Sequence, residues 1–414
     1  MSFRAHLLAA CVVLVAAIWL SSGTMAPYAS TWSSPAVSAP CHYLYNVDHP
    51  QFRATFAMLD GAPRNEWGFS VVLRRILFPL VAYPFMKLLD FERGGFLTSV
   101  LAHLAALLAL GLSLRRREGE RAAILGVWLL ATWPGVTYWA ALPYSYSAIV
   151  PASVGLYLLL ARLANETSLR RAALLASGMG VLFTAYDFLP IFGVAAVMTL
   201  AVARRWRVLA VTVPCLLLPT VVSLLALRLV WHASTNNSNT AIYSTVMGAY
   251  LHPPALGVWL SALRDLPSVT LANFLFSTFL FLPLLFLALL PFGTRTTHAE
   301  RAILLATALI FLFNNLAPPY VSRWQMRGLF IARLYQPVFV VFLFYAARAA
   351  TTRLPVVLCI VAIAANLTIA FGPIARVPWA GYVYHRFYMH AQANTMELNL
   401  DRWGRRPMGF CGGR

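Results

Sequence analysis

The chain of 414 residues is 60% hydrophobic and only 11% charged, with a formal net charge of +19 at pH 7. Soluble domains carry about 25% charged residues, so this composition excludes an ordinary globular protein. It is typical of a polytopic membrane protein, in which the backbone polar groups are satisfied inside helices. The arginines cluster in the short connections between apolar runs. Such clusters are typical of residues that orient membrane helices, and this explains the positive charge better than nucleic-acid binding does.

The chain opens with an apolar run within Met1–Ser22. Two interpretations stay open: a cleaved signal peptide, for which a clean A-x-A site is missing, and a retained signal-anchor helix, which we favour. In both cases residues 23–93 are expected outside the cytoplasm as the first external loop. Within it, residues 69–89 carry Arg74 and Arg75 in an apolar segment, which predicts an interfacial helix with its charges among the lipid headgroups.

Apolar runs of about 17 to 24 residues without period-2 alternation follow, which predicts helices rather than barrel strands. The expected spans are Gly94–Leu114, Ala122–Leu142, Tyr144–Leu163, Ala172–Tyr186, Phe188–Ala203, Val208–Trp231, Val269–Phe292, Ala302–Val321, Gly328–Ala349 and Leu354–Phe371. With the opening helix they make an all-α transmembrane domain, residues 1–372, of about 11 helices.

The N-terminus is expected in the cytoplasm, because each inward connection is short and carries arginine. A second external loop is expected at residues 232–268. Residues 373–414 then form an external C-terminal tail, whose side reverses if the span count is off by one.

Several short motifs resemble elements of GT-C glycosyltransferases, the polytopic enzymes that include dolichyl-phosphate-mannose mannosyltransferases and aminoarabinose transferases. They are Asp48-x-x-x-Phe52, Arg75-x-x-Phe78-Pro79-Leu80, Gly94-Gly95-Phe96-Leu97, Tyr144-Ser145-Tyr146-Ser147 and Arg333-Leu334-Tyr335-Gln336-Pro337. The likeness covers roughly residues 5 to 350 in layout. It departs from the family where Asp48 is followed by His49, because many members have paired acids there.

The resemblance implies a GT-C-like fold in a multi-pass protein of the bacterial inner (plasma) membrane, with its active-site loops on the periplasmic or extracellular side. The donor would be a sugar linked to polyprenyl phosphate, and the acceptor a glycan, lipid or protein of the cell envelope. The partners are then membrane lipid and lipid-linked sugar, with no nucleic acid and no covalently bound cofactor.

Asp48 is the leading catalytic candidate. A carboxylate at a membrane–water boundary can deprotonate an acceptor hydroxyl or hold a cation, although an aspartate that caps a turn explains the same residue. The resemblance favours the essential acid of the first external loop. Asp60 and Glu66 are candidates for a second carboxylate, and Asp187, between two apolar runs, is either a third candidate or a turn former.

The lipid phosphate that leaves in such a reaction needs cations, and arginine binds phosphate bidentately. The candidates are Arg75, Arg323, Arg327 and Arg333, with Tyr144 and Tyr146 as candidates for stacking on the sugar. Arginines at the ends of spans also extend toward headgroups for purely structural reasons, which leaves both interpretations open.

Two external cysteines, Cys41 and Cys411, are candidates for a disulfide. No histidine has a partner at ligand spacing, so no metal site is predicted, and the need for a divalent cation is left open. Two other functions stay open. A transporter or flippase of a lipid-linked or anionic solute would use Arg228 and Arg333, and an O-antigen-ligase-like or polymerase-like enzyme would use external arginines and a histidine such as His252.

Overall fold

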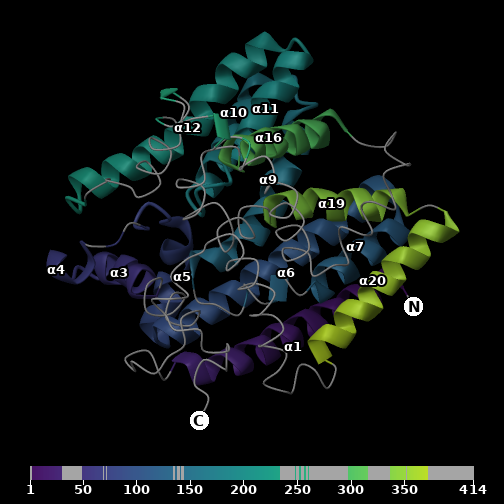
Figure 1. Cartoon of the computed structure of the whole chain (residues 1–414), viewed down its shortest axis with the longest axis horizontal. Helices are drawn as coiled ribbons and strands as arrows, with labels where there is room; N and C mark the ends of the chain where they lie inside the picture. The colour runs from purple at the N-terminus through teal and green to yellow at the C-terminus, as the bar shows by residue number, and fades with distance from the viewer. Residues whose placement is uncertain are drawn as a thin grey trace.

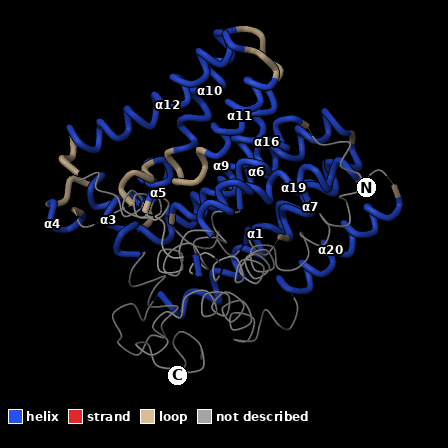
Figure 2. The backbone as a smooth tube through the Cα atoms, turned by 45° about the horizontal axis from the view of Figure 1, so that its top comes forward, coloured by secondary structure: helices blue, strands red, loops and turns tan. Residues whose placement is uncertain are grey.

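A computed structural model gives the architecture of the chain. It describes residues 2–29, 49–68, 70, 72–133, 136–137, 140, 144–233, 248, 251–252, 256–257, 260, 297–315, 336–350 and 352–371. Helices account for 83% of the structure, and no strand occurs among these residues (Figure 2). The prediction of an all-α fold is confirmed.

The helices lie close to the predicted runs. In chain order they are α1 (Phe3–Ala29), α3 (His49–Leu59), α4 (Arg64–Trp67), α5 (Leu77–Leu88), α6 (Phe91–Glu118), α7 (Glu120–Thr132), the 3-10 helix η2 (Ser145–Ala148), α9 (Ile149–Leu163), α10 (Leu169–Phe183), α11 (Ile191–Val202), α12 (Trp206–Leu229), α16 (His298–Asn315), α19 (Gln336–Ala349) and α20 (Arg353–Phe371). Each predicted span with described residues contains a helix, and the span predicted at Val269–Phe292 lies outside the described residues.

Two groups of helices pack together, mainly through α9. In the first group, α7 is in contact with α1, α6, α19 and α20 (Figure 1). In the second, α10 packs against α12, and α11 packs against α12 and α16. The shared helix α9 contacts α6 and α19 of the first group and α10 and α11 of the second, so it lies at the centre of the molecule.

Three of the described helices are long and apolar enough to cross a membrane: Phe91–Glu118, Ser145–Leu163 and Trp206–Leu229. Large apolar side chains also point outward, as Leu217, Val221 and Leu225 do on α12. An exposed apolar face is unfavourable in water and is compatible with contact to lipid. These features indicate a membrane protein, whereas the count of 11 spans stays a prediction.

The helix α6 runs from one end of the molecule to the other. It begins after Asp90, whose carboxylate caps it by accepting the backbone N–H of Arg93 at 2.6 Å. Its 28 residues are about 42 Å long at 1.5 Å per residue. Gly119 has a φ of +93°, which glycine adopts without strain, and there the chain reverses into α7. In Figure 1, α3, α4 and α5 gather at one end of the bundle, and the N-terminus of α1 lies at the other.

The span expected at Ala122–Leu142 is interrupted, and the reason is local. The helix α7 stops at Thr132, and Trp133 is extended, with φ −64° and ψ 114°. Trp133 precedes Pro134, whose ring disfavours helical conformation in the residue before it. The Trp-Pro pair therefore ends α7 at Thr132, and residues 136, 137 and 140 of the predicted span are helical again.

The expected interfacial helix over residues 69–89 also needs correction. The helix α5 begins only at Leu77. Arg75 precedes it in a turn, where its backbone N–H donates to the carbonyl of Val72 at 2.9 Å. Arg75 is 5% exposed, so its guanidinium lies inside the protein and is not open to lipid headgroups as we expected. An ion pair with the partly buried Asp187, described below, explains this position.

Candidate functional site

Three segments that are distant in sequence meet at the end of the bundle where α5 begins. They are the turn at residues 72–76, the start of η2, and the turn at residues 184–188 between α10 and α11. The backbone N–H of Leu77 donates to the carbonyl of Thr184 at 3.4 Å, and the Ser145 hydroxyl donates to the carbonyl of Arg75 at 3.4 Å. These two bonds hold the backbone around Arg75.

The side chains of Arg74 and Arg75 converge on Asp187. Nε of Arg75 donates to Oδ2 of Asp187 at 2.7 Å, and Nη2 of Arg74 donates to the same oxygen at 2.8 Å. Nη2 of Arg75 lies 2.6 Å from Oδ2, and Nε of Arg74 bonds Oδ1. The carboxylate is thus shared by two guanidinium groups, which we call the arginine pair.

The charge balance of the arginine pair and Asp187 is positive. Burial alone would raise the pKa of the Asp187 carboxyl, but the charges of Arg75 and Arg74 outweigh it and hold this pKa below its ordinary value. Two guanidinium groups and one carboxylate therefore carry a net charge of about +1 at neutral pH. An ionised, doubly paired carboxylate is a poor general base, which disfavours Asp187 as the second catalytic carboxylate.

Aromatic rings surround Arg75. Its guanidinium carbon lies 4.5 Å from the ring centre of Tyr186 and 5.7 Å from that of Tyr146, both within cation–π range. Phe52 stacks on Tyr144 at 4.9 Å and meets Tyr146 edge-on at 5.0 Å. Both Tyr144 and Tyr146 are buried. Their rings are therefore occupied by packing around Arg75, and neither offers an open face to a sugar in this arrangement.

One donor of Arg75 stays without a partner. Its Nη1 atom is buried and has no hydrogen-bond acceptor within the part of the chain that the structure describes. A buried guanidinium donor without an acceptor is unfavourable, and an anionic oxygen of a ligand would satisfy it. No protein-family model and no curated protein matches this chain. The chemistry of the site is therefore inferred from its geometry, which suits an anion at the arginine pair.

Replacing Asp187 with asparagine is expected to lower the free energy of unfolding in detergent by about 1–3 kcal/mol, because the arginine pair loses its counter-ion. The folded-state pKa of Asp187 is depressed below the ordinary 3.8. Its stabilisation is thus present above pH 3.8 and is lost as the pH falls through the folded-state value.

Unfolding measured at neutral and at acid pH checks this expectation: the difference between the wild type and Asp187→Asn should shrink in acid. Asp60→Asn, which removes an exposed carboxylate, is the control and should change stability much less. Equal losses in the two variants would contradict a special role for the carboxylate between Arg74 and Arg75.

The other predicted carboxylates lie elsewhere. Asp60 is exposed, pairs with Lys87 and accepts the Tyr83 hydroxyl at 3.0 Å, and these partners lower its pKa. Glu66 is exposed in the short helix α4. Within the described residues no hydrogen bond or ion pair joins either of them to the arginine pair, and the proposed role of both as second carboxylate stays a prediction.

Several predicted residues lie outside the described part of the chain: Asp48, Arg323, Arg327, Arg333, Cys41 and Cys411. The helix α3 begins at His49, the residue that follows Asp48, and its Phe52 packs on the tyrosines around Arg75. The described cysteines, Cys11, Cys215 and Cys359, are free, and no group of metal-binding side chains occurs among the described residues.

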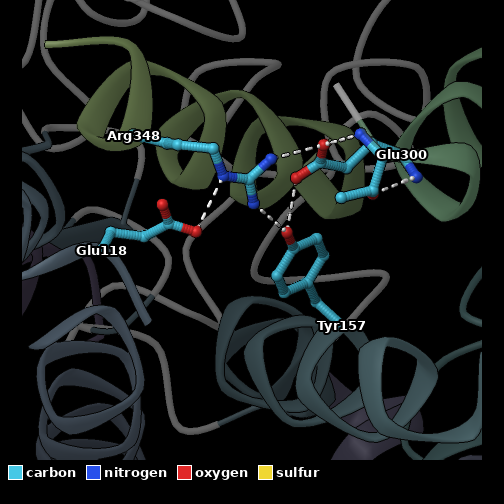
Figure 3. Close-up of polar contacts among 5 residues, drawn as sticks. Glu118, Tyr157, Glu300 and Arg348 are labelled. Carbon is cyan, nitrogen blue, oxygen red and sulfur yellow. Dashed lines mark hydrogen bonds and ion pairs between the residues drawn. The ribbon is translucent and has the colours of Figure 1, made fainter. Parts of the chain in front are cut away.

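A second polar cluster, which sequence patterns did not single out, joins four helices (Figure 3). Arg348 of α19 donates from Nη1 to Oε2 of Glu300 at 2.9 Å, from Nε to Oε1 of Glu118 at 3.0 Å, and from Nη2 to the Tyr157 hydroxyl at 3.1 Å. That hydroxyl donates to Oε1 of Glu300 at 2.5 Å. We call these residues the Arg348 network.

One local signal for the Arg348 network was present in the sequence. Thr297 and Glu300 form a capping box at the start of α16: the Glu300 N–H donates to Thr297 Oγ1 at 3.2 Å, and Oε2 of Glu300 accepts the Thr297 N–H at 2.7 Å. The T-x-x-E pattern predicts the helix start. It gives no indication that Tyr157 and Arg348 also bind this glutamate.

Proposed function

We propose that the chain is an integral-membrane glycosyltransferase of GT-C type. It would move a sugar from a polyprenyl-phosphate donor to an acceptor on the non-cytoplasmic side of a bacterial inner membrane. One observation carries the proposal furthest. Arg75 is buried among aromatic rings next to the helix that follows Asp48, and its Nη1 has no acceptor among the described residues. A buried, partly unsatisfied arginine suits an anionic lipid phosphate.

In the proposed reaction one bond to the anomeric carbon forms and one breaks, and charge is conserved. Asp48 accepts the proton of an acceptor hydroxyl, and the oxygen attacks the anomeric carbon of the sugar. The bond between that carbon and the phosphate oxygen breaks, and its electron pair leaves with polyprenyl phosphate. The arginine pair would stabilise the charge that grows on the phosphate, because fixed donors in a water-poor site stabilise developing charge strongly.

The topology that this function requires is part of the proposal. About 11 spans with a cytoplasmic N-terminus put the first external loop and the turn at residues 184–188 on one side of the membrane. The arginines at 115–117, at the far end of α6 from the arginine pair, support this orientation because positive residues favour the cytoplasmic side. Arg323, Arg327 and Arg333 stay candidates for contact with the same phosphate.

The transporter alternative receives less support. Arg228 lies in the last turn of α12 and is exposed, which is where a span-end arginine extends to the headgroups. Charged residues deep in the membrane would mark a solute pathway, and an exposed arginine in the last turn of a helix is not such a residue. His252, relevant to a ligase-like enzyme, is also exposed.

Replacing Arg75 with lysine tests the proposed phosphate contact. Lysine keeps the charge beside Asp187 but loses the planar fork, so we expect kcat/KM to fall about 10- to 100-fold while the protein still inserts. Purified protein in proteoliposomes receives a polyprenyl phosphate that carries a radiolabelled sugar, with envelope extract as acceptor. The measurement is the release of polyprenyl phosphate.

Arg93→Lys is the matched control, because Arg93 is exposed on the same end of the molecule and forms only an ion pair with Asp90 within the described residues. It should keep the wild-type rate. Full activity in Arg75→Lys would remove the arginine pair from the reaction, and no release by the wild type with any lipid-linked sugar would refute the glycosyltransferase.

A further inference from the structure

A basic groove lies at the end of the molecule opposite the arginine pair. It is formed where α6 and α9 end and α10 begins, and it consists of two adjoining cavities of about 240 and 510 Å³ that share Arg117 and Arg162. Its remaining polar lining is Ser113, Arg116, Asn165, Glu166 and Arg171. The groove belongs to neither the arginine pair nor the Arg348 network.

The groove carries a strong positive charge. Its four arginines and one glutamate give 4 − 1 = +3. All four arginines are exposed, and none forms an ion pair with an acidic side chain in the described ranges. The glutamate, Glu166, is occupied locally, because its Oε1 accepts the backbone N–H groups of Thr167 and Ser168 at 3.0 and 2.9 Å. The charge of Arg171 also acts on Glu166, whereas the guanidinium groups of Arg116, Arg117 and Arg162 are available to an external anion.

Beside the arginines the groove is apolar. The lining side chains Leu112, Leu158, Leu174 and Leu175 come from α6, α9 and α10. Leu112 and Leu174 are exposed and line the same groove as the four arginines. A soluble inorganic anion such as phosphate has no apolar part that could contact the adjoining leucines. A phospholipid has both parts, a phosphate for the arginines and an acyl chain for the leucines.

We propose that this groove binds an anionic phospholipid, with its phosphate between Arg117 and Arg162 and an acyl chain along the leucines. Arginine clusters at span ends also arise from the rule that orients membrane helices, and that rule alone requires no cavity. Here three helices contribute arginines to one groove with an apolar wall. The bound lipid would contact all three helices and so stabilise the packing of the start of α10 against α6 and α9. This inference is independent of the proposed sugar transfer.

The test uses the full chain, purified in a neutral detergent and delipidated, then titrated with dioleoylphosphatidylglycerol. Bound lipid is counted by native mass spectrometry, and thermal unfolding is followed in parallel. The wild type should retain phosphatidylglycerol in preference to phosphatidylcholine and should melt at a higher temperature with it. The double variant Arg117→Gln/Arg162→Gln should bind it at least about tenfold more weakly, because two charge-assisted contacts are lost.

Arg170→Gln/Arg207→Gln is the matched control. It removes two exposed arginines at the starts of α10 and α12 that do not line the groove, and it should bind lipid as the wild type does. Equal weakening in the two double variants would show a general charge effect and would overturn the site. Equal retention of phosphatidylcholine, or unchanged binding in Arg117→Gln/Arg162→Gln with a wild-type gel-filtration profile, would overturn it as well.

Discussion

Replacement of Asp48 with asparagine is expected to slow sugar transfer by about 10²- to 10⁴-fold, the contribution typical of a positioned general base. Asparagine has nearly the same shape as aspartate, but its amide cannot take a proton from the acceptor hydroxyl. The measurement is the release of polyprenyl phosphate in proteoliposomes. The amount of inserted protein, quantified in the same vesicles, separates lost chemistry from lost folding.

Glu92→Gln is the control for this change. It removes the same charge at an exposed position in the first turn of α6, at the same end of the molecule as the arginine pair. It should keep the wild-type rate, because we attribute the slower transfer in Asp48→Asn to the lost base and not to the loss of one negative charge. A rate in Asp48→Asn equal to that of Glu92→Gln would exclude Asp48 as the base.

The same assay separates the three function classes when Arg333→Ala and His252→Ala are included. A glycosyltransferase of the proposed type loses activity in Asp48→Asn and Arg333→Ala and keeps it in His252→Ala. A ligase-like or polymerase-like enzyme keeps activity without Asp48 and loses it without the histidine. A transporter moves labelled lipid-linked solute across sealed vesicles and releases no polyprenyl phosphate in any variant.

The parts of the fold that could be predicted from sequence are those that depend on local pattern. Apolar runs located α6, α9 and α12 to within a few residues, because hydropathy and helix length are properties of consecutive residues. The early end of α7 was also encoded locally, in the proline that follows Trp133, and hydropathy alone overlooked it.

The parts that could not be predicted depend on pairing between distant residues. Arg75 was recognised as an unusual charge, but its partner Asp187 is 112 residues away, and nothing near either residue specifies the pair. We assigned Arg75 to the headgroups because an unpaired arginine is costly in hydrocarbon; the pairing removes that cost. In the Arg348 network, Arg348 and Glu118 are 230 residues apart, and Tyr157 was indistinguishable from the apolar residues around it.

The two polar clusters play different roles because their charges are satisfied differently. At Arg75 a buried donor stays open within the described residues, which suits a ligand. In the Arg348 network, Nε, Nη1 and Nη2 of Arg348 each donate a hydrogen bond. A closed network of this kind has little capacity for a further anion, and its position between α6, α9, α16 and α19 points to a structural function.

Replacing Arg348 with methionine is therefore expected to cost about 3–5 kcal/mol of unfolding free energy, the largest stability loss we predict. The Arg348 side chain is 12% exposed and that of Glu300 is 1% exposed, so removal of the cation leaves a buried carboxylate without its counter-ion. Glu118 loses the same partner. The free energy of unfolding in detergent, or the shift in melting temperature, measures the effect.

A double variant distinguishes lost pairing from lost packing. Arg348→Met/Glu300→Gln removes both charges, so it should recover part of the stability lost in Arg348→Met, since the penalty comes from an uncompensated buried charge. Arg353→Met, at an exposed position at the start of α20, is the control and should be nearly neutral. If Arg348→Met were no more destabilising than Arg353→Met, the network would not be what joins α16 and α19 to α6 and α9.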